Sequence, residues 1–197
     1  MRMRKDALTA AAEIVLSLER SCGGGPGAAG PPPTVHGLVC TVGKLSLWPG
    51  ASNVIAGAVN MTVDIRSGDD VDRLAVIATL EARVAEVCAQ RGVQCAVRLV
   101  HEAAAVHSDA RLMEKLSRAV QGSAQSCPAD GACAERPPHL VSGAGHDALA
   151  MAELGPMAMM FVRCRGGVSH SPLEHVSDED VGSAVQTLHA FLLEDLL

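Results

Sequence analysis

Aromatic side chains are nearly absent from this chain of 197 residues, which has one Trp, two Phe and no Tyr. We therefore do not expect it to bind its ligands by stacking on bases or sugars. It has no basic cluster longer than the RMRK at its start, and its formal net charge is −6. The sequence thus gives no electrostatic footprint for nucleic acid, although a few local arginines are enough to hold a small anionic substrate.

Long apolar runs and C-x-x-C pairs are also absent. Charged residues interrupt the apolar positions of the first twenty residues, which recur with helical period. This pattern indicates an amphipathic helix and neither a signal peptide nor a membrane span. The cysteines are odd in number and irregularly spaced, so we expect mostly buried free thiols and no disulfide scaffold or zinc ribbon. They are Cys22, Cys40, Cys88, Cys95, Cys127, Cys133 and Cys164.

The first half of the chain predicts a compact α+β unit. Apolar periodicity favours a helix, two antiparallel strands, a second helix ending at Gly92, and a third strand. A Gly/Pro-rich stretch at 22–33 is expected to form a surface loop after the first helix. This order is typical of a two-layer sandwich. The expected elements lie at 1–20, 37–47, 53–66, 71–91 and 93–102.

The second half has a different pattern, in which short strands alternate with helices. Such a pattern is typical of α/β layering, with loops at the strand ends available for a site. We expect helices at 108–125, 146–154 and 178–196 and strands at 139–143 and 157–162. The overall expectation is an α/β protein whose halves are pieces of two different domains.

Three stretches carry residues suited to chemistry: SNVIAGAVNMTVDIR (52–66), SGAGHDA (142–148) and RCRGGVSHSPLEH (163–175). Each one alone has an ordinary explanation. Asp147 can interact favourably with the positive end of a helix dipole. A lone histidine in a loop, such as His170, is usually an ordinary surface residue. A strand arginine such as Arg66 is usually solvated or part of an ion pair.

Taken together, the stretches TVGKLSLWPGASNVIAGAVNMTVDIR, SGAGHDALAMAEL and FVRCRGGVSHSPLEHV resemble the C-terminal part of a known family. This family is the metal-dependent amidohydrolases of the M20 peptidase superfamily, which process carbamoyl and ureido compounds. Within it, these sequence motifs are most similar to the allantoate amidohydrolase (allantoate deiminase) branch of plants and algae. The resemblance implies a lid and dimerisation domain over 1–101, without its start, and the C-terminal part of a catalytic domain over 102–197.

The resemblance also implies roles for individual residues. Asn53 and Arg66 would bind the substrate carboxylate, His146 would be a catalytic residue that contacts the substrate, and His170 would be a metal ligand. Gly166 and Gly167 would let the backbone turn tightly before His170. The implied cofactor is a binuclear Mn²⁺ site, although Zn²⁺, Co²⁺ or Ni²⁺ accept the same ligand types. No role is implied for Arg163, Arg165, Glu174 and His175.

The intact enzyme is expected to convert allantoate to ureidoglycine, ammonia and CO2. The alternative activities are those of ureidoglycolate amidohydrolase and N-carbamoyl-L-amino-acid hydrolase, which would share the same site plan. In this family the other metal ligands and the general-base glutamate lie upstream of the position that matches Met1. We therefore expect the isolated chain to be inactive, whether it is a truncated gene product or a non-catalytic dimerisation module.

The expected partners are a small ureido substrate and a second copy of the chain, with no nucleic acid and no membrane. The resemblance to plant relatives implies the endoplasmic reticulum as the compartment, and the cytoplasm is the alternative.

Overall fold

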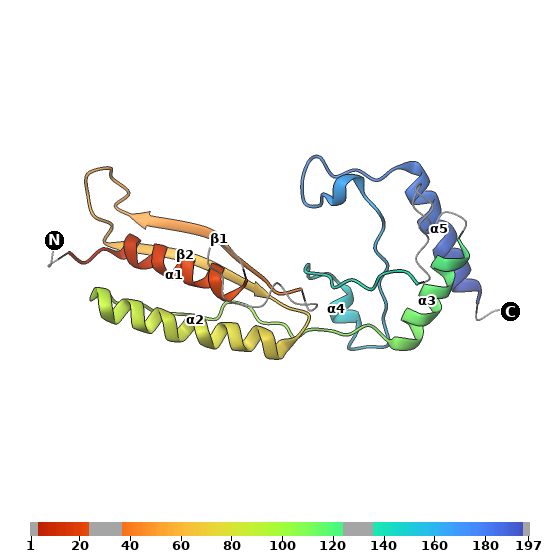
Figure 1. The fold of residues 1–197 in the computed structure, drawn as a ribbon, viewed down its shortest axis with the longest axis horizontal. Coiled ribbons are helices and arrows are strands. Elements are labelled where there is room, and N and C mark those ends of the chain that lie inside the picture. Colours follow the sequence, from red (N-terminus) through yellow and green to blue (C-terminus); the bar gives the residue numbers. More distant parts are fainter. Residues whose placement is uncertain (1–3, 24–36, 124–135, 195–197) are drawn as a thin grey trace. The chain divides into compact units, whose positions relative to one another are not determined.

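The computed structural model describes residues 4–23, 37–123 and 136–194 and divides into two compact units (Figure 1). Unit 1 comprises Met1–Ala105 with Val141–Gly145, and unit 2 comprises Val106–Leu140 with His146–Leu197. The expected division into a lid domain (1–101) and a catalytic part (102–197) stays a prediction. Most of the Gly/Pro-rich loop, Cys127 and Cys133 lie outside the described residues.

The sheet of unit 1 is an antiparallel pair of β1 (Val39–Trp48) and β2 (Ala58–Arg66). Its register joins Val39 to Arg66 at one end and Trp48 to Ala58 at the other, with an irregularity between Val42 and Lys44. The predicted alternation along β2 is confirmed, because one face is half-buried while the opposite face is exposed. The half-buried side chains are Val59, Met61, Val63 and Ile65.

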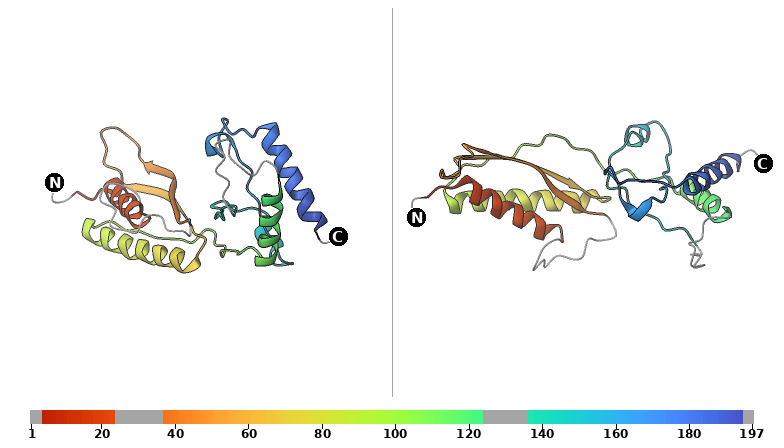
Figure 2. Two further views of the ribbon diagram at one scale, coloured as in Figure 1. Left: turned by 45° about the vertical axis from the view of Figure 1, so that its right-hand side comes forward. Right: turned by 90° about the horizontal axis from the view of Figure 1, so that it is seen from above.

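Two helices pack against each other and contact β2, which makes a two-layer unit (Figures 1 and 2). Helix α1 (Ala7–Ser21) begins after Asp6, whose carboxylate accepts hydrogen bonds from Leu8 N and Thr9 N at 3.0 and 3.2 Å. Helix α2 (Asp70–Arg91) ends as predicted at Gly92, which has φ 63°. Their shared core consists of Ala10, Ile14, Val87 and Cys88.

The third predicted strand, 93–102, is wrong, as are the predicted strands at 139–143 and 157–162. Within the part of the chain that the structure describes, the only ladder joins β1 and β2. A strand exists only where a neighbouring strand accepts its backbone hydrogen bonds, and apolar alternation does not supply that neighbour. Val97, Leu99 and Val100 are accordingly 56%, 68% and 81% exposed.

The expectation of free thiols is wrong for four cysteines, because Cys22 bonds to Cys40 and Cys88 bonds to Cys95. The first bridge ties the end of α1 to β1. The second follows from the left-handed turn at Gly92, which reverses the chain after α2 and brings the Cα atoms to 6.2 Å. Cys164 is free and half-buried.

Unit 2 is built on α3 (Ala110–Gly122) and α5 (Asp178–Leu193), which pack side by side (Figure 2). Lys115 places its ammonium 4.6 Å from the centre of the Phe191 ring between them. The expected helix at 146–154 shrinks to α4 (Ala148–Met151), and a short 3-10 turn, η1 (Arg165–Gly167), follows. No described helix is long and apolar enough to cross a bilayer.

Candidate functional site

The four site residues predicted from the sequence lie in two pairs. Asn53 and Arg66 belong to unit 1, and His146 and His170 belong to unit 2.

Arg66 is the last residue of β2 and is held from two sides. Its Nε and Nη2 donate to the two carboxylate oxygens of Asp64 at 2.7 and 2.8 Å, and its Nη1 donates to the carbonyl oxygen of Gly143 at 3.0 Å. The hydrogen bonds from Arg66 hold the pKa of Asp64 below its usual value. The guanidinium is thus aligned for bidentate binding of a carboxylate, and in this structure that carboxylate is the one of Asp64.

The contact between Arg66 and Gly143 brings two of the three sequence stretches together. Residues 142–145 lie in unit 1 beside the end of β2, and His146 follows them directly in the chain. Sequence reasoning missed Asp64 and Gly143. Asp64 had a signal, since residues two apart on a strand share a face, whereas nothing local identified Gly143.

Asn53 lies in the exposed connection between β1 and β2, far along the hairpin from Arg66. Arg66 pairs with Val39 at the opposite end of the ladder. Since β2 has nine residues, a rise of roughly 3.4 Å per residue separates its two ends by roughly 27 Å. In one copy of the chain, Asn53 and Arg66 cannot contact the same small substrate. Their shared role in carboxylate binding stays a prediction.

His146 lies two residues before the start of the short helix α4 and is half-buried. Its Nδ1 accepts a hydrogen bond from Ala148 N at 3.2 Å, whereas Asp147 makes no side-chain cap. The imidazole thus takes the capping role that we considered for Asp147. Because Nδ1 is an acceptor, the neutral ring carries its proton on Nε2, which can donate to a substrate oxygen.

The loop 163–175 is closed by hydrogen bonds at its base. Arg165 N donates to His175 O at 2.8 Å, and Arg163 Nε donates to Asp180 of α5 at 2.8 Å. The predicted role of the two glycines is confirmed, because Gly166 and Gly167 have φ values of 65° and 67°. The ion pair with Asp180 gives Arg163 a structural partner.

His170 is exposed in the middle of this loop. Its backbone adopts φ 55°, and its N–H donates to Glu174 Oε2 at 2.9 Å. Among the described residues its imidazole has no hydrogen bond or ion pair, so the ring is available to a ligand.

The described residues contain no group of three or more His, Cys, Asp or Glu side chains that could hold a metal ion. A single exposed imidazole suits a divalent metal as one ligand but is too small a donor set for a metal centre. The described part of the chain thus contributes at most a part of such a centre.

Comparison with known proteins agrees with the sequence motifs. The pattern of peptidase family M20/M25/M40 matches residues 19–194. Allantoate deiminase of Arabidopsis thaliana is 44% identical over 98% of this chain, and ureidoglycolate hydrolase of the same plant is 30% identical over 95%. A crystal structure of an amidase of the hydantoinase/carbamoylase family from Burkholderia multivorans matches 98% of the chain with a TM-score of 0.79 and 30% identity.

The chain is much shorter than these proteins. It spans 38% of the Arabidopsis allantoate deiminase, 36% of the ureidoglycolate hydrolase and 42% of the Burkholderia amidase.

Proposed function

Because the chain belongs to peptidase family M20/M25/M40, we propose that it is part of a hydrolase that cleaves C–N bonds of linear ureido compounds, with allantoate as its substrate. The products would be ureidoglycine, ammonia and CO2.

The observation that carries the choice of substrate is a difference in identity between two enzymes of one plant. The chain is 44% identical to the allantoate deiminase and 30% identical to the ureidoglycolate hydrolase over nearly the same residues. This difference favours allantoate. Ureidoglycolate and N-carbamoyl-L-amino acids are the alternative substrates.

The residues of this chain would bind and orient the substrate. Arg66 would bind the carboxylate through its planar guanidinium, with Asp64 displaced to solvent, and Asn53 of a second copy of the chain would add a neutral hydrogen bond. His146 would donate from Nε2 to an oxygen of the substrate. These contacts would fix the ureido group in place for attack by water.

Members of this family are generally metal-dependent. A divalent metal, Mn²⁺ in this proposal, would supply an activated water for the hydrolysis when bound. His170 would be one of its ligands, and Zn²⁺, Co²⁺ or Ni²⁺ fit an imidazole ligand as well.

A chimera tests the function. The part of the Arabidopsis allantoate deiminase that this chain does not cover would be joined to the 197 residues, and ammonia release would be measured with Mn²⁺. We expect turnover of allantoate with a kcat/KM at least about tenfold above that for ureidoglycolate or an N-carbamoyl-L-amino acid. The 197-residue chain alone should release no ammonia, because its described residues supply too few metal ligands.

The matched control joins the same upstream part to the corresponding piece of the ureidoglycolate hydrolase. A folded chimera of our chain that prefers ureidoglycolate or an N-carbamoyl-L-amino acid would contradict allantoate as the substrate. A folded chimera without any amidohydrolase activity would instead favour a non-catalytic dimerisation module.

The two disulfides of unit 1 support an oxidising compartment for this protein. The endoplasmic reticulum fits this condition and is our proposal for its location.

A further inference from the structure

The backbone of His170 is the starting point, because among the described residues it is the one non-glycine residue with a positive φ. Side chains with a Cβ disfavour this left-handed region, and such residues persist where their surroundings impose the conformation. His170 is exposed, so packing cannot impose it. Hydrogen bonds within the loop must do so.

Glu174 provides the bond that fixes this conformation. Its Oε2 accepts from His170 N at 2.9 Å, and a charged acceptor makes such a bond stronger than a neutral one. If the peptide between residues 169 and 170 rotated, the His170 N–H would turn away from the Glu174 carboxylate. The hydrogen bond between them therefore opposes this rotation.

The backbone on both sides of Glu174 is itself held. Glu174 N donates to Ser171 O at 3.0 Å, and Leu173 N donates to Ser171 Oγ at 3.2 Å. Pro172 restricts φ inside this turn. On the other side, His175 O accepts from Arg165 N at 2.8 Å. The Glu174 side chain is therefore a short brace between a fixed turn and a strained residue.

We propose that Glu174 is a positioning residue, which holds the His170 backbone in its left-handed conformation so that the imidazole is presented to its ligand. Among the described residues the ring makes no hydrogen bond or ion pair that would orient it. The identification of the ligand as a divalent metal rests on the proposed function. The role of Glu174 in fixing the His170 backbone does not depend on that function.

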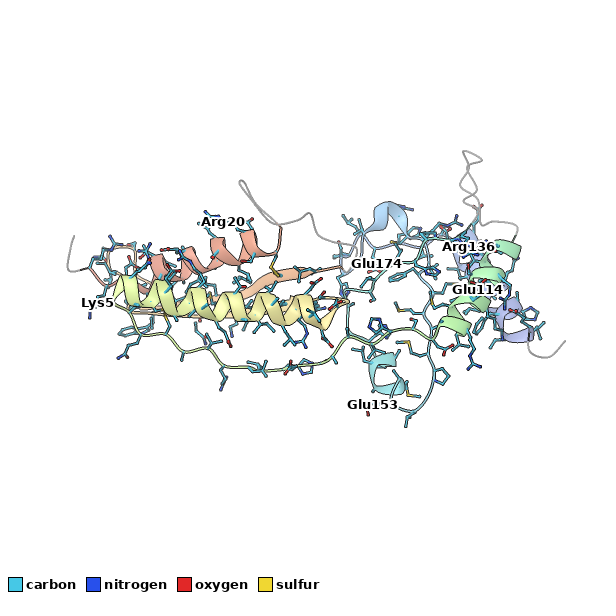
Figure 3. The ribbon with its side chains drawn as sticks, turned by 60° about the horizontal axis from the view of Figure 1, so that its bottom comes forward. Lys5, Arg20, Glu114, Arg136, Glu153 and Glu174 are labelled. Atoms are coloured by element: carbon cyan, nitrogen blue, oxygen red, sulfur yellow. A yellow bond between two sulfur atoms is a disulfide. The ribbon has the colours of Figure 1, made fainter. Side chains whose placement is uncertain are left out.

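The first test uses the 197-residue chain and NMR. Glu174→Ala should speed amide hydrogen exchange at His170 by about tenfold or more and change its HN–Hα coupling, because the N–H loses its acceptor. Glu174→Gln keeps an amide oxygen at the same reach and should restore most of the protection. Glu153→Gln is the matched control, since this glutamate is exposed beyond α4 (Figure 3).

The second test uses the chimera and measures metal content, kcat and KM. Glu174→Ala should lower bound metal and kcat while circular dichroism stays unchanged, and Glu174→Gln should rescue both. In the His170→Ala background, Glu174→Ala should cause no further loss, because the two residues act as one unit. A merely structural loop residue would give additive losses.

The outcomes separate the two claims. Unchanged exchange at His170 in Glu174→Ala, or additive losses in the double variant, would overturn the positioning role. If the exchange changes as expected but His170→Ala leaves metal content and activity intact, the role of His170 in the proposed function is wrong, and with it the presentation of its ring to a metal.

Discussion

Among single side chains, Arg66 combines a strong sequence signal with a specific environment. The structure holds its guanidinium flat between Asp64 and Gly143, with both of its bidentate donors occupied by a carboxylate. Asp64 is half exposed at 50%, so a substrate carboxylate can compete for the same donors. In the proposed enzyme, the substrate carboxylate would replace Asp64 on these donors.

In the chimera, Arg66→Lys should raise KM for allantoate about tenfold or more and lower kcat less. Lysine replaces a planar fork by a point charge, and each charged hydrogen bond contributes about 1.5–3 kcal/mol. Steady-state kinetics would measure both constants. Arg98→Lys is the control, because Arg98 is exposed in the same unit. An unchanged KM would remove Arg66 from the carboxylate site.

The sequence predicts only part of this environment. Alternation along β2 fixes which residues share a face, so the pairing of Asp64 with Arg66 follows from their spacing. The bond to Gly143 joins residues that are 77 apart in the chain, and no local pattern reveals it. The hydrogen bond between His170 and Glu174 is local in the sequence. The left-handed backbone of His170, which this bond stabilises, cannot be predicted from the residue types, because histidine does not favour that conformation.

At the level of helices and strands, α2 and the segment after it show why some elements are predictable. Asp69 as N-cap, the apolar face and Gly92 as C-cap are all local signals, and the helix occupies Asp70–Arg91, one residue more than the expected 71–91. The strand expected over 93–102 depends on a distant partner and is wrong. The Cys88–Cys95 bridge depends on the reversal at Gly92, which the irregular cysteine spacing did not suggest.

We expect Cys95→Ala to lower the unfolding free energy of unit 1 by about 2–3 kcal/mol under oxidising conditions. The bridge closes a loop with a sequence separation of 7, and cross-linking of this kind restricts the unfolded chain. Cys95 is exposed, so the substitution leaves the core residue Cys88 in place. Urea unfolding followed by circular dichroism would measure the change.

The control for this variant is Cys164→Ala, which removes the free, half-buried thiol of unit 2. It should leave the unfolding of unit 1 unchanged. Equal urea midpoints for the wild-type chain and Cys95→Ala without reductant would show that the bridge contributes nothing to stability.

For the chain as a whole, the roughly 27 Å that separate the two ends of β2 raise the question of how Asn53 and Arg66 meet one substrate. A second copy offers an answer. If two β1 strands pair antiparallel across a two-fold axis, the Trp48 end of one copy lies beside the Val39 end of the other. Val39 is the ladder partner of Arg66, so Asn53 of the partner subunit, five residues after Trp48, would approach Arg66.

We therefore predict a homodimer formed through the outer edge of β1. Among the described residues this strand pairs only with β2, and its apolar side chains Leu45 and Leu47 are 44% and 42% exposed. Light scattering at high micromolar concentration should give the mass of two chains.

The double variant Leu45→Lys with Leu47→Lys should weaken the dimer at least about tenfold. Like charges from two copies would then face each other across the axis, and lysines disfavour the pairing of strand edges. Val71→Lys, on the exposed side of α2 at 75% exposure, is the control and should leave the mass unchanged. A strictly monomeric wild-type chain, or a control variant that dissociates as readily, would contradict β1 as the interface and leave Asn53 and Arg66 without a common substrate.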